Sequence, residues 1–202
     1  MKIEQALQEL RKAKKRKFSQ TLDLIVNLEN YDARKQQINT FVKIPNPSPK
    51  NICGFLTKKT KLVDTVTKEE FDKFKTTREI KKFARKYDFF IAAAPLMSAI
   101  ATKFGRVFGP LGKMPSPQGG IIPVDNDDSI KAMVEKMKNM IRVRTKEKTI
   151  KIAIGKDDMS DEKLKQNIES VLQSVEAILP LKRDNIKNSM IKFTMTKAIK
   201  LD

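Results

Sequence analysis

Two kinds of hydrophobic spacing follow one another near the start of the chain. In residues 3–14 the apolar positions recur every three or four residues, which predicts an amphipathic helix. Residues 18–28 change to strict alternation, which predicts a strand with one buried face. The alternation returns at residues 38–44, so we expect these two strands to form an antiparallel pair. The apolar positions are Ile3, Ala6, Leu7 and Leu10, then Phe18, Leu22, Leu24, Val26 and Leu28, then Ile38, Val42 and Ile44.

Strands and helices alternate in the middle of the chain. Residues 88–94 (DFFIAAA) are typical of a parallel strand that is buried on both faces. Further elements are expected as a short strand at 52–56, a charged helix at 68–86, a helix at 95–103, the apolar segment IIPV at 121–124 and a helix at 127–141 whose Met133, Met137, Met140 and Ile141 share one face. This order predicts a small α/β domain.

The last part of the chain repeats the pattern of the first. Residues 150–155 alternate as a strand, Ser160 can cap a following helix, and residues 189–201 predict one final strand. Neither terminal section is large enough for a stable core by itself. We therefore expect one discontinuous α+β domain from both termini, residues 1–47 plus 148–202, and an inserted α/β domain of residues 48–147. The prolines of PNPSPKN at 45–51 mark a linker between them.

The segment FGRVFGPLGKMPSPQGG, residues 104–120, holds five of the seven glycines. Glycine weakens regular structure and proline removes a backbone donor, so we expect a shaped loop rather than a helix or a central strand. Arg106 and Lys113 would be its charged tips. The segment is not a Walker loop, because that motif requires glycine where this chain has Val107 and a hydroxyl where it has Met114. Its glycine spacing does not fit a dinucleotide loop either.

Charge points to the class of partner. The chain has 42 Lys and Arg against 24 Asp and Glu, a net charge of +18, and residues 11–17 read RKAKKRK. A surplus this large and this widely spread favours a polyanion such as nucleic acid, although simple solubility is an alternative. A membrane is disfavoured, since no stretch approaches the roughly 18 apolar residues of a spanning helix and the N-terminus lacks a secretory core.

Residue types that most enzymes need are scarce. The sequence has no histidine and one cysteine, which removes His-based catalysis, His metal ligands and Cys-cluster zinc sites. Cys53 lies in the apolar run ICGFL and is expected to be a buried thiol in a reducing cytoplasm. Asp125, Asp127 and Asp128 precede a helix, where capping explains them more simply than a metal does. We expect no catalytic residue, no metal and no cofactor.

Several segments carry a resemblance to a known family. Residues 104–120 resemble the central loop of the ribosomal protein L1 family, whose pattern is approximately LGRxLGPRGKMPxP. KFSQTLDLIVNL at 17–28, IGKDDMSDEKLKQNI at 154–168 and KFTMTKAIKL at 192–201 resemble other family segments in the same order. The resemblance implies a discontinuous RNA-binding domain and an inserted Rossmann-like domain, joined by a hinge near 45–51 and 145–149.

The resemblance also implies function and partners. It implies a non-enzymatic ribosomal protein of the cytoplasm that binds ribosomal RNA of the large-subunit stalk, contacts the exit-site tRNA, and is a monomer when free. A second hypothesis is translational repression through its own mRNA, and a third is a nucleotide-dependent enzyme that uses the inserted domain. The enzyme hypothesis would require Lys113 for turnover of a nucleotide.

The RNA-binding residues follow from the same resemblance. Phe18 and Met195 have an alternative as core residues, because each shares the parity of buried neighbours. Thr196 and Lys197 stand where the family usually has glycine and proline. The basic run 11–17 could also be a solvated helix end. The residues implied to bind RNA are Lys17, Phe18, Gln20, Thr21, Lys156, Lys192, Thr194, Met195, Thr196 and Lys197, with Arg106 and Lys113 as secondary RNA or tRNA contacts.

Overall fold

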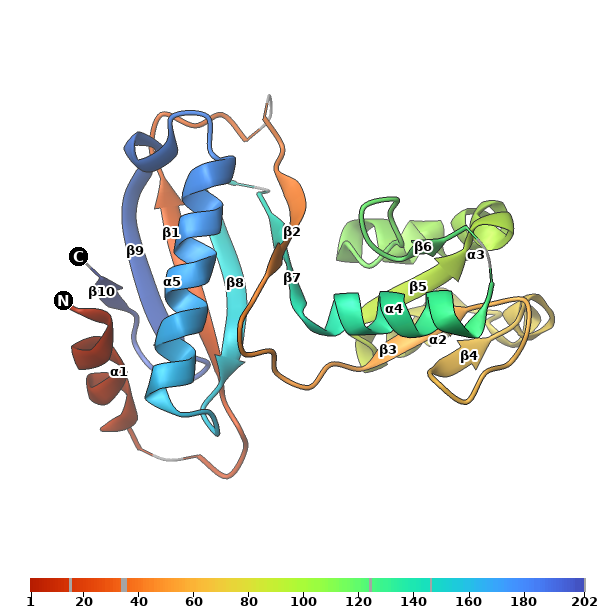
Figure 1. Cartoon of the computed structure of the whole chain (residues 1–202), viewed down its shortest axis with the longest axis horizontal. Coiled ribbons are helices and arrows are strands. Elements are labelled where there is room, and N and C mark those ends of the chain that lie inside the picture. Colours follow the sequence, from red (N-terminus) through yellow and green to blue (C-terminus); the bar gives the residue numbers. More distant parts are fainter. Residues whose placement is uncertain (15, 34–35, 124, 146, 202) are drawn as a thin grey trace. The chain divides into compact units, whose positions relative to one another are not determined.

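A computed structural model describes residues 1–14, 16–33, 36–123, 125–145 and 147–201 (Figure 1). Lys15 of the basic run and Val124 of the IIPV segment lie outside these ranges. The chain forms two compact units, which we call unit 1 (residues 1–48 and 139–202) and unit 2 (residues 49–138). The structure thus groups residues 139–147 with the terminal segments, whereas the sequence placed them in the insert.

Unit 1 is built on a four-stranded antiparallel sheet with the strand order β10–β9–β1–β8. One helix, α5, crosses the sheet in Figure 1, and α1 packs against α5, β9 and β10. A separate two-stranded sheet is formed by β2 and β7. The elements of unit 1 are α1 (Ile3–Arg11), β1 (Thr21–Leu28), β2 (Asn39–Lys43), β7 (Met140–Arg144), β8 (Thr149–Lys156), α5 (Asp161–Ile178), a 3₁₀ turn η3 (Lys182–Asn185), β9 (Ile186–Phe193) and β10 (Ile199–Leu201).

The alternation in the sequence decides which face of this sheet is buried. In β1 the even-numbered residues are buried and the odd-numbered ones are only half-buried. The buried side chains meet the apolar stripe of α5, as the amphipathic pattern predicted. These core positions are Leu22, Leu24, Val26 and Leu28 of β1, Ile150, Ile152 and Ile154 of β8, and Leu164, Ile168, Val171 and Val175 of α5.

Unit 2 contains a parallel four-stranded sheet with the order β4–β3–β5–β6. Every residue of β3 is buried, since helices cover both faces of this sheet. On one face α2 and α3 pack around Phe55, whose ring lies 5.2–6.3 Å from five other phenylalanine rings. The elements are β3 (Ile52–Phe55), β4 (Asp64–Val66), η1 (Lys68–Lys73), α2 (Thr77–Lys86), β5 (Phe89–Ala93), η2 (Ala94–Leu96), α3 (Met97–Leu111), β6 (Ile121–Ile122) and α4 (Asp127–Lys138).

The expectation of a loop throughout residues 104–120 is wrong. Residues up to Leu111 continue helix α3, because Phe104, Val107 and Phe108 extend its buried face. Pro110 lacks an N–H donor and lies in the last turn, and the helix ends just after it, where Gly112 adopts φ 70°. The predicted helix at 95–103 was therefore too short.

Other predicted elements differ in pairing or extent. The strand at 38–44 does not pair with β1; β2 pairs with β7, and β1 lies between β8 and β9. The single strand at 189–201 is two strands, because residues 194–198 turn between β9 and β10. The helix at 127–141 ends at Lys138, so Met140 and Ile141 belong to β7. The charged helix at 68–86 is interrupted between η1 and α2.

Candidate nucleic-acid interface

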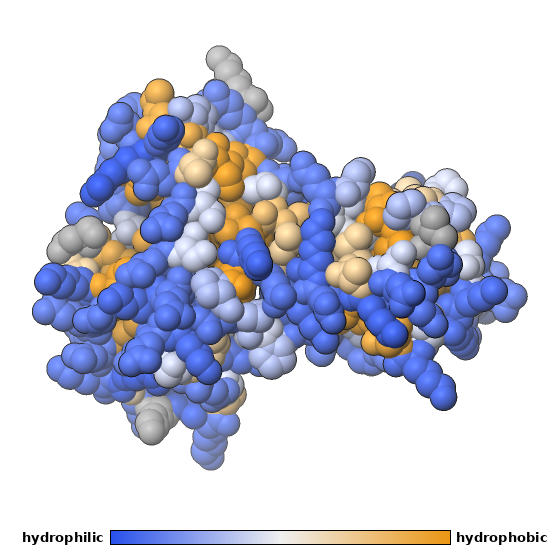
Figure 2. All heavy atoms as spheres, viewed as in Figure 1, coloured by the Kyte–Doolittle hydropathy of each residue, from blue (hydrophilic) through white to orange (hydrophobic). Residues whose placement is uncertain are grey.

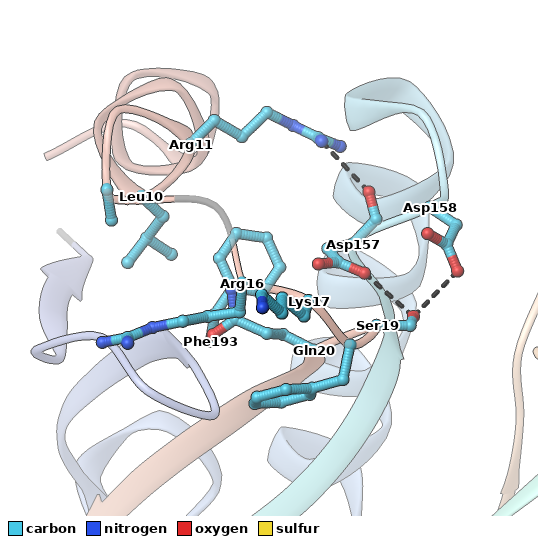
Figure 3. A pocket seen from close by; sticks show the side chains of 11 residues that line it. Leu10, Arg11, Arg16, Lys17, Ser19, Gln20, Asp157, Asp158 and Phe193 are labelled. Carbon is cyan, nitrogen blue, oxygen red and sulfur yellow. Dashed lines mark hydrogen bonds between the residues drawn. The ribbon is translucent and has the colours of Figure 1, made fainter.

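Three chain segments meet at one end of the four-stranded sheet in unit 1 (Figure 3). They are residues 16–20 before β1, residues 156–159 at the end of β8, and residues 194–198 between β9 and β10. Because β1 is antiparallel to both neighbours, its start lies beside the ends of β8 and β9. With the end of α1 these segments line two open hollows of about 500 and 340 Å³. We call the three segments the sheet-end surface.

Backbone hydrogen bonds fasten the turn after β9 to the start of β1. The Thr21 amide donates to Thr194 Oγ1 over 3.1 Å, and the Thr194 amide donates to the Thr21 carbonyl over 3.1 Å. Gln20 Oε1 accepts from the Met195 amide over 3.2 Å. Gln20 is buried, so its side chain holds the turn instead of facing outward. The Thr194 hydroxyl and the Thr21 backbone groups are likewise hydrogen-bonded within the protein.

The two large apolar residues of the sheet-end surface are exposed. Phe18 is 52% exposed and Met195 is 57% exposed, so neither belongs to the core. The parity argument for core packing is wrong, because β1 begins only at Thr21 and β9 ends at Phe193. Exposed apolar side chains beside basic ones suit a nucleic acid, whose bases offer flat surfaces next to phosphates.

The turn needs no glycine at position 196. Among the described residues other than glycine, positive φ angles occur at Asn30 and Lys182, and Thr196 is not one of them. Thr196 Oγ1 accepts from the Phe193 amide over 2.9 Å, which closes the turn. The replacement of the family's usual glycine therefore leaves the backbone conformation unstrained.

Basic residues surround the exposed pair. Lys17 and Lys197 are exposed on the sheet-end surface, and Lys156 is exposed at the end of β8. Lys192 differs, since it lies on the open sheet face and pairs across strands with Asp23. Burial raises the pKa of the Asp23 carboxyl, and the nearby Lys192 ammonium partly opposes this rise. Lys192 therefore has a carboxyl group beside it on the neighbouring strand.

Comparison with known proteins shows the family to which the chain belongs. Residues 10–197 match the model of the Ribosomal protein L1p/L10e family. A protein named large ribosomal subunit protein uL1 in Thermococcus kodakarensis is 35% identical over 214 residues, which cover 100% of this chain and 97% of that protein. The chain belongs to the ribosomal protein L1 family. Proteins of the same name in Nanoarchaeum equitans and Archaeoglobus fulgidus are 35% and 36% identical, covering 95% and 98% of this chain and 95% and 94% of the relatives.

The secondary residues of this L1-family chain lie in unit 2 and have different environments. Arg106 is exposed on α3. Lys113 is not a loop tip: its Nζ donates to the carbonyls of Ala84 and Tyr87 over 2.8 and 2.6 Å, and so closes the end of α2. Burial lowers the pKa of Lys113.

Sequence reasoning missed one residue that shapes the sheet-end surface. The guanidinium of Arg11, at the end of α1, pairs with Asp161 and donates to the Asp157 and Met159 carbonyls over 3.1 and 2.6 Å. Arg11 therefore ties α1 to the segment after β8. Nothing in the sequence of the basic run distinguishes Arg11, which connects two segments, from its basic neighbours.

Ser19 also contacts the segment at the end of β8. Its hydroxyl lies 2.9 Å from a carboxylate oxygen of Asp157 and 2.8 Å from one of Asp158 (Figure 3). Within the described ranges, no group of three Cys, His, Asp or Glu side chains is placed to hold a metal ion. None of the described helices is long and apolar enough to span a membrane.

Proposed function

We propose that this chain is a structural, non-enzymatic protein of the cytoplasmic large ribosomal subunit that binds ribosomal RNA through the sheet-end surface. One observation carries the proposal: the sheet-end surface exposes Phe18 before β1 and Met195 in the turn after β9, with lysines in the same segments, and Gln20 holds that turn by a hydrogen bond. Structured RNA is bound through phosphates, 2′-hydroxyls and unstacked bases, and this surface offers partners for each. Hydrophilic side chains cover most of the face seen in Figure 2, and the net charge of +18 suits a polyanionic partner.

The two units would then be the two domains of the proposal. Unit 1 would be the discontinuous RNA-binding domain and unit 2 the inserted Rossmann-like domain, supported by the parallel sheet with helices on both faces. The family resemblance further supports contact with exit-site tRNA in the stalk, and repression by an mRNA segment held on the same surface. We propose that the free protein is a monomer without a cofactor.

RNA specificity tests the main proposal. Filter binding should show tight binding of large-subunit stalk RNA and weak binding of a scrambled RNA of equal length. Affinity should fall with salt, by roughly 0.7–0.9 logarithmic units per tenfold salt for each phosphate contact. Equal affinity for both RNAs would reject the specific role.

Met195 gives the cleanest variant for this surface. Met195→Ala should weaken stalk-RNA binding by about 1–2 kcal/mol, because the exposed thioether chain would lose burial against RNA. Thr194→Ala is a poorer test, since its hydroxyl accepts the Thr21 amide and its loss would also loosen the turn. Unchanged affinity of Met195→Ala would move the contact elsewhere.

A further inference from the structure

Unit 2 contains a hollow that the RNA surface of unit 1 does not explain. Its volume is about 610 Å³, and four of its lining residues are lysines: Lys50, Lys61, Lys86 and Lys138. They come from four segments, namely the entry to β3, the loop between β3 and β4, the end of α2 and the end of α4. Because β3, β4 and β5 all begin here, the hollow lies at the amino ends of the parallel strands. In open α/β sheets, ligands usually bind at the carboxyl ends, so the fold alone does not account for this hollow.

The acidic residue in the hollow is already engaged. Asp64 accepts from the Tyr87 hydroxyl over 2.7 Å and lies 3.9 Å from Lys86 Nζ. In the described part of the chain, Lys61 and Lys138 have no carboxylate partner, and both are exposed. The remaining charge in the hollow is therefore positive.

Lys50 supplies a second, independent observation. Its Nζ donates to the carbonyl of Lys138, the last residue of α4, over 3.0 Å, which is a helix-capping role. Burial lowers the pKa of Lys50 to about 8, and the charge of Asp88 only partly opposes this. A half-buried ammonium group of this kind is stabilised when an anion approaches it.

Apolar residues complete the lining. Ile52, Leu62, Val63 and Val134 border the lysines, and Leu62 is 41% exposed. Lysine ammonium groups bind phosphate as point charges, while apolar side chains can contact a sugar or base. An acidic peptide would use the lysines but would gain less from this apolar border.

We propose that this hollow of unit 2 binds a phosphate group, and that its occupant is a phosphodiester of RNA held by Lys50, Lys61 and Lys138. This contact is additional to the sheet-end surface of unit 1, and it does not depend on it.

Residue-resolved NMR on the full chain tests the proposal. Inorganic phosphate should shift the amide signals of Asn51, Leu62 and Tyr87 in a saturable way, and an RNA octauridylate should shift them at lower concentration. The pKa of the Lys50 side chain should rise when phosphate is bound. Shifts with phosphate and none with octauridylate would identify a free phosphate as the occupant and overturn the RNA assignment.

Matched variants separate the hollow from general basicity. Lys61→Gln with Lys138→Gln should weaken both titrations about tenfold, because two charged contacts are lost. Lys131→Gln with Lys136→Gln removes the same charge from exposed positions of α4 outside the lining and should leave them unchanged. Equal losses in both pairs, or equal shifts with pentaglutamate, would overturn the proposal. Signals of the sheet-end surface are read in the same spectra, so failure here and failure of the proposed function are distinguishable.

Discussion

Replacing Phe18 with alanine should reduce RNA affinity while the protein stays folded. A phenylalanine offers about 150–250 Å² of surface, and Phe18 is 52% exposed, so roughly 100 Å² is available for contact. At about 25 cal/mol per Å² this amounts to about 2.5 kcal/mol, and stacking of a base on an aromatic ring is worth about 1–3 kcal/mol. We therefore expect Kd for stalk RNA to rise about 5- to 150-fold. The free energy of unfolding should fall by less than the roughly 3–5 kcal/mol typical of a core phenylalanine, since about half of Phe18 is exposed.

Leu181 provides the matched control for Phe18. It is 54% exposed in the same unit, but it follows the end of α5, whereas the sheet-end surface adjoins the start of that helix. A helix of 18 residues spans about 27 Å, so Leu181 is far from the proposed contact. Isothermal titration calorimetry with stalk RNA should give normal affinity for Leu181→Ala. If Phe18→Ala bound RNA as tightly as Leu181→Ala does, the sheet-end assignment would be refuted.

Three further predictions test packing and ionisation. Gly155→Ala should lower the free energy of unfolding by about 1–3 kcal/mol in urea titrations. The new Cβ would lie 2.6 Å from Cδ2 of Leu164, which is fully buried. An unchanged unfolding midpoint would contradict this packing. Hydrogen bonds, the strongest from Lys73, lower the pKa of Glu70 from 4.5 to about 2. The ionised carboxylate therefore stabilises the fold above pH 4.5, and this contribution is lost as the pH falls towards 2. Glu70→Gln should flatten that part of the Tm-versus-pH curve, and a curve identical to that of the unmodified protein would contradict this assignment. Burial raises the pKa of Cys53 to about 12, so iodoacetamide at pH 8 should label it in urea and not in the native protein, and rapid native labelling would show the thiol to be accessible.

The secondary-structure prediction succeeded where one physical pattern acted alone. The alternation in residues 18–28 predicted β1 and its buried face, although the strand begins only at Thr21, and the apolar run at 88–94 contains β5. Pairing was less predictable, because alternation states which face is buried and not which strand is the neighbour. The partner of β2 is β7, whose first two residues, Met140 and Ile141, the sequence had assigned to the end of a helix.

The sheet-end residues show the same limit at the level of single side chains. The resemblance identified Phe18 and Met195, but parity left them undecided between core and surface, since the ends of β1 and β9 could not be located to one residue. Arg11 could not be recognised in a run of similar residues, because its role depends on carbonyl groups almost 150 positions away in the chain.

The glycine–proline run is the segment that most strongly marks the family, yet its residues have local structural roles. Lys113 closes the end of α2, and Gly112 ends α3 in a conformation that favours glycine. At Gly120 φ is +113°, and a Cβ there would lie 2.7 Å from the Phe90 carbonyl oxygen, so no other residue fits. These residues are required because the run connects two helices to a parallel sheet. The run can therefore be typical of the family even if it does not contact RNA. Arg106 is exposed on α3 five residues before that helix ends, so a substitution there reports on RNA contact without disturbing a helix end.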